Sequence, residues 1–105
     1  MQKKNQKVNL ANLSKGMWAA LNVAERVAKR ELGENYEVTI TSGNDGKHME
    51  NSKHYVNQAV DIRTRDMGTI NDVYRVGYAM KKELGKDYDV IVEKDHIHIE
   101  YEPKK

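Results

Sequence analysis

The apolar residues of the chain recur at helical spacing in two stretches. Over residues 13–32 they fall three to four positions apart, which predicts an amphipathic helix with one apolar stripe. Asn12 or Ser14 can cap the start of this helix, and Gly33 suits the position after its end. Over residues 69–84 the same spacing predicts a second helix, which opens with a Thr69-x-x-Asp72 capping box. The expected buried stripe of the second helix comprises Ile70, Val73, Gly77, Met80 and Leu84.

Shorter segments alternate between apolar and polar residues, which is the pattern of half-buried strands. They are residues 37–41, 59–63, 87–93 and 96–101, and the last two form a hairpin around a turn at residues 93–95. The fold class predicted is therefore α+β: a small, mostly antiparallel sheet with two helices packed on one face. We expect a single domain over residues 1–105, with residues 1–8 and 103–105 as frayed tails.

Residues 42–57 are the only long segment without periodicity. The segment is rich in Gly, Asn, Ser and Lys, and it holds two of the four histidines, His48 and His54. A loop of this length in so small a domain is more often functional than not.

The charge balance argues against a nucleic-acid partner. Five of the 18 basic residues are lysines in the two expected tails, so the body of the chain has 13 basic against 16 acidic residues. A body with this balance is a poor match for a phosphate backbone. No apolar run is long enough to span a bilayer, and the basic N-terminus has no apolar region behind it. We therefore expect a monomer made in the cytoplasm without a signal peptide and without a membrane partner.

Chemistry-bearing side chains gather on one face of the predicted sheet. With Ile97 and Ile99 in the core, alternation places His96, His98 and Glu100 on the opposite face of their strand. Alternation likewise turns Asp61 and Arg63 away from the core side of the earlier strand, and His54 can fold over them from the loop.

If the two strands are neighbours, imidazoles and a carboxylate meet there, which suits Zn²⁺ with one coordination position left open. A carboxylate for acid–base chemistry is still required, and Asp95 at the hairpin turn is well placed, with Glu93 as the alternative.

Two stretches resemble the signatures of the peptidase M15 family. Ser52-x-His54-(x)6-Asp61 is similar to its Ser-x-His-(x)6-Asp motif, and Asp95-x-x-His98 is similar to its Asp/Glu-x-x-His motif. The family contains zinc D-Ala-D-Ala carboxypeptidases and dipeptidases and the L-alanyl-D-glutamate endopeptidases of bacteriophage endolysins. It shares its fold with the Hedgehog signalling domain, and the resemblance covers about residues 37–101.

Carried over by position, the resemblance implies three zinc ligands, His54, Asp61 and His98. It implies that Asp95 is the general base that activates the attacking water, and that His96 stabilises the tetrahedral intermediate. Ser52 is implied to hydrogen-bond the substrate.

The family often carries a substrate-binding Arg soon after a strand-ending Ser-Gly, and this chain has none after Ser42-Gly43. The candidates to supply that positive charge are Lys47, His48 and Arg63. The resemblance predicts a zinc metallopeptidase that degrades the cell wall by cleaving peptidoglycan stem peptides, as an endopeptidase or a D,D-carboxypeptidase. It would act as a phage-type endolysin released through a holin, or on cytoplasmic muropeptides. The alternatives are a catalytically silent zinc-binding domain, such as a virion component, and a metal-free interaction domain.

Overall fold

Two helices and a five-stranded sheet form the part of the chain that the structure describes, which comprises residues 1–11, 13–43 and 58–103. In this computed structural model the elements follow one another as β1 (Gln2–Lys3), α1 (Lys15–Leu32), β2 (Thr39–Ser42), β3 (Ala59–Arg63), α2 (Ile70–Leu84), β4 (Tyr88–Val92) and β5 (His96–Tyr101). The order along the sheet is β1-β2-β3-β5-β4, and only the β1–β2 pair is parallel. The α+β class predicted from the sequence is confirmed.

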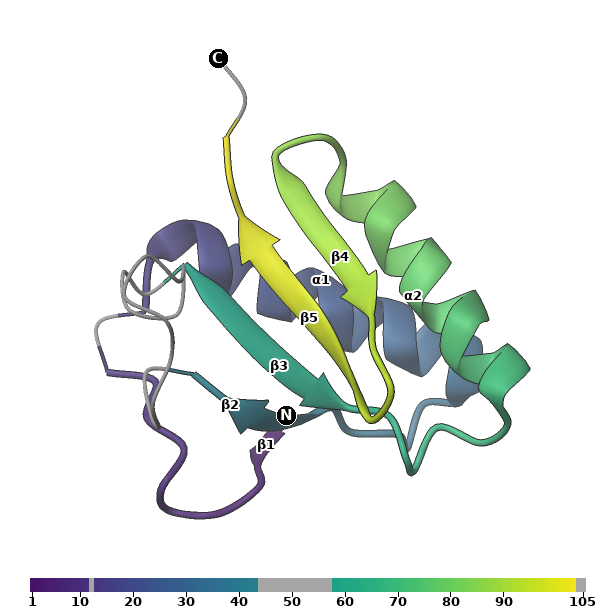
Figure 1. Cartoon of the computed structure of the whole chain (residues 1–105). Helices are drawn as coiled ribbons and strands as arrows, with labels where there is room; N and C mark the ends of the chain where they lie inside the picture. Colours follow the sequence, from purple (N-terminus) through teal and green to yellow (C-terminus); the bar gives the residue numbers. More distant parts are fainter. Residues whose placement is uncertain (12, 44–57, 104–105) are drawn as a thin grey trace.

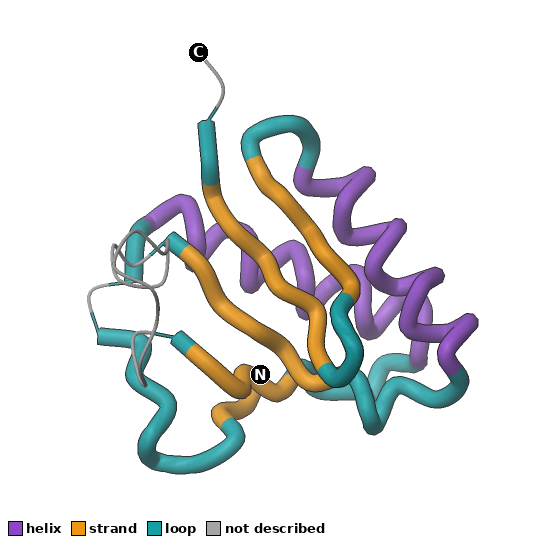
Figure 2. The backbone as a smooth tube through the Cα atoms, viewed as in Figure 1, coloured by secondary structure: helices purple, strands orange, loops and turns teal. Residues whose placement is uncertain are grey.

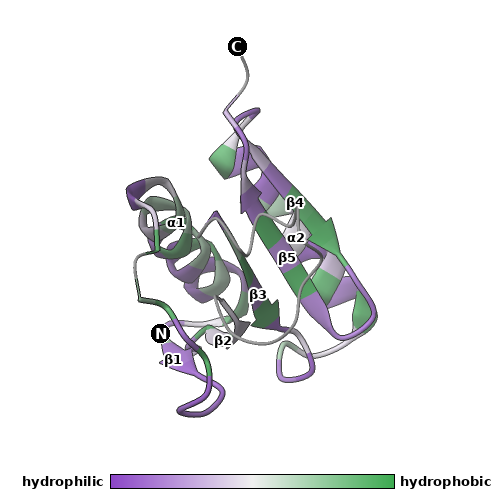
Figure 3. Cartoon of the chain, turned by 60° about the vertical axis from the view of Figure 1, so that its left-hand side comes forward, coloured by the Kyte–Doolittle hydropathy of each residue, from purple (hydrophilic) through white to green (hydrophobic). Residues whose placement is uncertain are grey.

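The core lies between the sheet and the two helices; in Figure 1, α1 passes behind the strands and α2 runs beside β4. The largest fully buried side chains come from both layers: Met17, Leu21, Ile40, Ile62, Met80, Ile97 and Ile99. In Figure 3, β3 is mostly in the hydrophobic colour, α1 carries both colours, and β1 is hydrophilic. Since this core occupies one face of the sheet, the polar side chains of β3 and β5 are left on the other face.

The helices begin and end as their sequences predict. Ser14, one of the two predicted caps, accepts a hydrogen bond from the backbone N–H of Met17, and both halves of the Thr69–Asp72 capping box are formed. Within the described residues, no helix is long and apolar enough to cross a membrane.

One predicted member of the buried stripe of α2 is wrong. Ile70 is 60% exposed, whereas Val73, Val76, Gly77 and Met80 are buried. At 100° per residue the buried stripe is centred between Val73, Gly77 and Met80, so Ile70 lies at its edge and in the first turn of the helix. The predicted stripe was therefore turned slightly away from the observed one.

The N-terminal residues belong to the sheet, in place of the frayed tail predicted for residues 1–8. The backbone N–H groups of Gln2 and Lys4 donate to the carbonyls of Val38 and Ile40, at 2.7 and 2.8 Å. The chain then leaves β1 as a loop that leads to α1 (Figure 2), and Val8 in this loop is only 1% exposed. Backbone pairing of a two-residue strand needs no side-chain pattern, so periodicity could not reveal it. Of the predicted C-terminal tail, residues 104–105 lie outside the described part.

We expect Val8→Ala to lower the free energy of unfolding by about 2 kcal/mol, because two buried methyl groups are lost from the core. Urea denaturation followed by circular dichroism measures the change. Lys7→Ala, at an exposed neighbouring position, is the matched control and should change stability by less than about 0.5 kcal/mol. Equal stability of Val8→Ala and the unsubstituted protein would show that this segment is a tail after all.

Candidate functional site

The predicted site residues meet at the centre of the sheet face that the helices do not cover. In the antiparallel pair of β3 and β5, Asp61 is the partner of His98 and Arg63 is the partner of His96. Directly opposed residues project from the same face of a sheet, so these four side chains are neighbours. The adjacency of the two strands, which the sequence argument assumed, is confirmed.

His98 bridges two carboxylates. Its Nδ1 lies 2.8 Å from Asp61 Oδ1, and its Nε2 lies 3.2 Å from Glu100 Oε1. The side chains of His98 and Asp61 are each 15% exposed, so the contact is largely shielded from water. The hydrogen bond with Asp61 is the main reason why the pKa of His98 rises to about 9, against the opposing effect of burial. The ring is therefore an imidazolium at neutral pH when no metal is bound.

His96 lies next to this pair and contacts the hairpin turn. Its Nδ1 is 2.6 Å from Asp95 Oδ1, and its Nε2 is 3.6 Å from Asp61 Oδ1 and 3.6 Å from Glu93 Oε1. The hydrogen bond with His96 lowers the pKa of Asp95, whose side chain is 82% exposed. Asp95 thus fixes one nitrogen of the ring, and the other nitrogen faces Asp61.

We expect His98 of the metal-free protein to titrate near pH 9 and Glu100→Gln to lower its pKa, because one of the two carboxylates that favour the imidazolium is lost. The raised pKa stabilises the fold fully below the ordinary value of about 6.5, and this stabilisation is lost as the pH rises toward 9. NMR titration of the imidazole signals measures both effects. Glu102→Gln, which removes a charge two residues further on, is the control. A titration of His98 near 6.5 would contradict the bridged geometry.

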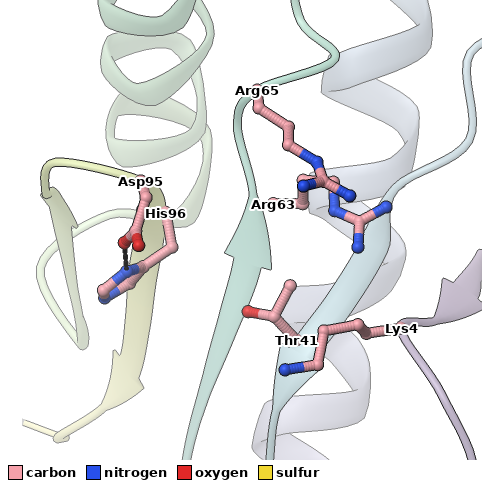
Figure 4. Close-up of a pocket in the computed structure, with 6 residues that line it drawn as sticks. All are labelled: Lys4, Thr41, Arg63, Arg65, Asp95 and His96. Atoms are coloured by element: carbon pink, nitrogen blue, oxygen red, sulfur yellow. Dashed lines mark hydrogen bonds and ion pairs between the residues drawn. The ribbon is translucent and has the colours of Figure 1, made fainter.

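A pocket of about 280 Å³ opens beside these residues. Its lining comes from four segments of the chain: Lys4, Thr41, Arg63 with Arg65, and Asp95 with His96. In Figure 4 the Asp95–His96 pair lies on one side, and the two arginines, Thr41 and Lys4 lie on the other. The pocket therefore joins the hairpin turn to a group of positive charges.

Five of the predicted site residues lie together in the structure, and the other four fall outside the described part of the chain. Asp61, Arg63, Asp95, His96 and His98 lie together as described above. The proposed ligand His54 and the proposed substrate-binding residues Ser52, Lys47 and His48 fall in residues 44–57, outside the described part.

Sequence reasoning assigned no role to four residues that the structure places in or beside the site: Lys4, Thr41, Arg65 and Glu100. Glu100 was expected on the correct face, and its contact with His98 follows from their i, i+2 spacing on one strand. Arg65 was not among the candidate residues, and Lys4 was expected in a frayed tail. Only the pairing of β1 with β2 brings Lys4 to the pocket, and no sequence signal predicted that pairing.

The contacts of Asp61 and His98 are compatible with a metal ligand pair. Two ligands of tetrahedral zinc lie roughly 3.3 Å apart, given bond lengths near 2.0–2.1 Å, and the observed separation of 2.8 Å is close to this. A ligating histidine commonly donates its other N–H to a carboxylate, and Glu100 is in place to accept it.

A second group of carboxylates lies on the same sheet face. Asp89, Glu100 and Glu102 each offer an oxygen within 4.8 Å of the other two. They supply oxygen ligands only, which suits Mg²⁺ or Ca²⁺ better than zinc. Partly exposed acidic groups of this kind are common without any ion, so this group carries no assignment.

The chain matches no protein-family model and no curated protein sequence.

Proposed function

We propose that the protein is a zinc metallopeptidase that hydrolyses peptide bonds in peptidoglycan stem peptides. The observation that carries the proposal is the register of β3 and β5, in which Asp61 and His98 are partners 2.8 Å apart. The two sequence motifs that resemble the M15 signatures require these two residues to meet, although 36 residues separate them along the chain. His96 and Asp95, from the second motif, lie beside the pair. His54 would complete the ligand set.

Each of these residues has a role that its surroundings support. Zinc, when bound, would polarise the scissile carbonyl and so make it more reactive toward water. Asp95 is ionised at neutral pH, because its pKa is lowered, and it would take a proton from the attacking water and deliver it to the departing amine. His96 directs Nε2 toward Asp61, and when its ring is protonated this nitrogen would donate an N–H to the developing oxyanion. Arg63, across the pocket from His96, would hold an anionic part of the peptide.

Digestion of purified peptidoglycan tests the proposal. We expect the zinc-loaded protein to release new peptide fragments with free amino termini, identified by mass spectrometry, because hydrolysis of an amide bond creates a free amino group. His98→Ala, treated with zinc in the same way, is the matched control and should release none.

Zinc-loaded protein that releases no fragment from several peptidoglycan types would contradict the proposal. If the protein binds zinc but releases no fragment, the silent zinc-binding domain is favoured. If it neither binds zinc nor releases fragments, the metal-free interaction domain is favoured.

A further inference from the structure

Three cationic side chains converge on the pocket next to the proposed metal site. Arg63 ends β3, Arg65 follows it by two residues, and Lys4 directly follows β1. In Figure 4 the two guanidinium groups lie close to each other, and the ammonium group of Lys4 lies beside Thr41 on the same side of the pocket. Residues from two distant parts of the sequence thus supply positive charge to one small space.

Carboxylates of the described residues do not neutralise this charge. Across residues 1–11, 13–43 and 58–103, no ion pair joins Lys4, Arg63 or Arg65 to an acidic side chain, although Arg26, Arg30 and Arg75 all have such partners. The acidic residue in the pocket lining, Asp95, is bonded to His96. With histidine counted as neutral, the lining carries three positive charges and one negative charge. This excess of positive charge in the lining favours an anionic ligand.

The types of cationic residue in the pocket favour carboxylate groups as ligands. Each guanidinium presents a planar fork of N–H donors that fits a carboxylate in a bidentate manner, and an ammonium adds a point charge. Thr41 contributes a hydroxyl to the same lining. Two arginines and a lysine can thus hold two carboxylate groups.

The pocket lies next to the Asp61–His98 pair, displaced by two residues along strands β3 and β5. Arg63 follows Asp61 by two residues on β3, and its partner His96 precedes His98 by two residues on β5. Two residues of strand span about 7 Å, which is also about the length of two residues of an extended peptide. A ligand bound at both places would therefore have its anionic groups within about two residues of the bond at the metal.

Resting on the proposed function, we propose that Lys4, Arg63 and Arg65 form an anion-binding subsite for a doubly negative segment of the peptide substrate. The enzyme would then prefer peptides with two carboxylates within about two residues of the scissile bond, such as an acidic residue that is also the carboxyl terminus. Arg65 and Lys4 are specificity-determining residues in this proposal, since the loss of either charge leaves Asp61, His98 and Asp95 unchanged.

The subsite can be tested without turnover, on the full-length metal-free protein, so that carboxylates cannot bind zinc. The probes are glutarate, which has two carboxylates, glutaramate, which has one, and inorganic phosphate. We expect glutarate to bind at least tenfold more tightly than glutaramate, with ¹H–¹⁵N chemical-shift changes concentrated at Lys4, Thr41, Arg63 and Arg65. Arg65→Gln should weaken glutarate binding about tenfold. Lys82→Gln on α2 removes the same charge away from the pocket and should leave binding unchanged.

Two results would overturn the subsite. One is equal binding of glutarate and glutaramate, and the other is phosphate binding more tightly than glutarate, which would assign the pocket to phosphate groups. Kinetics then separate this proposal from the proposed function. If peptidoglycan is cleaved and Arg65→Gln leaves KM unchanged, the subsite is wrong and the peptidase stands. If glutarate binds as expected but nothing is cleaved, the pocket stands as an anion site and the peptidase is wrong.

Discussion

The protein should bind one zinc ion per chain, and Asp61→Ala or His98→Ala should weaken that binding at least a hundredfold. Loss of a partner that only orients a ligand already costs 10–100-fold in affinity, so loss of a ligand itself should cost more. The M15 resemblance predicts the same result for His54→Ala. Competition with a chromophoric chelator measures the affinity, and elemental analysis of the purified protein gives the stoichiometry.

Zinc should also stabilise the fold, because a metal that binds only the native state shifts the unfolding equilibrium. At a free zinc concentration one hundred times the dissociation constant, the stabilisation is about 2.7 kcal/mol. For a domain of this size that corresponds to a rise of roughly 10–20 °C in melting temperature. Calorimetry with and without chelator measures the shift, which should disappear in His98→Ala.

Asp89→Asn is the matched control for these measurements. Asp89 lies on β4, opposite Glu100, and belongs to the second group of carboxylates on the same sheet face. Its substitution should leave zinc affinity within about threefold of the original, because a partly exposed charge that does not ligate the ion acts only weakly through solvent. If Asp89→Asn loses the metal while Asp61→Ala keeps it, the ion binds the all-oxygen group and the proposed ligand set is wrong.

The parts of the fold that depend on side-chain periodicity could be predicted from the sequence. The predicted strand over residues 59–63 coincides with β3, because Val60 and Ile62 alternate with Asp61 and Arg63 on a strand with one buried face. The hairpin of β4 and β5 follows from the same alternation. Strand β1 could not be predicted in this way, because Gln2 and Lys3 are both exposed and pair with β2 through backbone hydrogen bonds, which leave no alternation in the sequence.

The candidate site likewise has a part that follows from side-chain alternation and a part that does not. Alternation placed His96, His98 and Asp61 on one face, and the pairing of β3 with β5 made them neighbours, as expected. The cationic side of the pocket depends on the whole sheet, because Lys4 reaches it only through β1 and β2. Such a contact between distant segments leaves no mark in local spacing, so Lys4 and Arg65 could be found only in the folded chain.

Asp95→Asn should reduce kcat by two to four orders of magnitude and leave zinc bound. General-base catalysis contributes about 10²–10⁴-fold, and an amide cannot accept the proton. Asp95 lies at the hairpin turn with its side chain 82% exposed, and its contact with His96 does not involve the ligand pair. Zinc affinity should therefore stay within about threefold of the original. Steady-state kinetics on a defined stem peptide, together with the chelator assay, measure the two quantities separately.

Two variants at the same turn decide how Asp95 acts. Glu93 Oε1 lies 3.6 Å from His96 Nε2, so Glu93→Gln removes the rival carboxylate, and it should lower kcat by less than about tenfold.

His96→Ala removes the imidazole ring that Asp95 holds by a hydrogen bond. If Asp95 accepts the proton itself, Asp95→Asn should remain the more damaging change and should abolish the acidic limb of the kcat pH profile, which His96→Ala should retain. Equal losses in both variants would mean that Asp95 acts only by orienting His96. A larger loss in Glu93→Gln than in Asp95→Asn would transfer the role of base to Glu93, whose side chain is less exposed, at 48%, and faces the ring nitrogen that Asp95 leaves open.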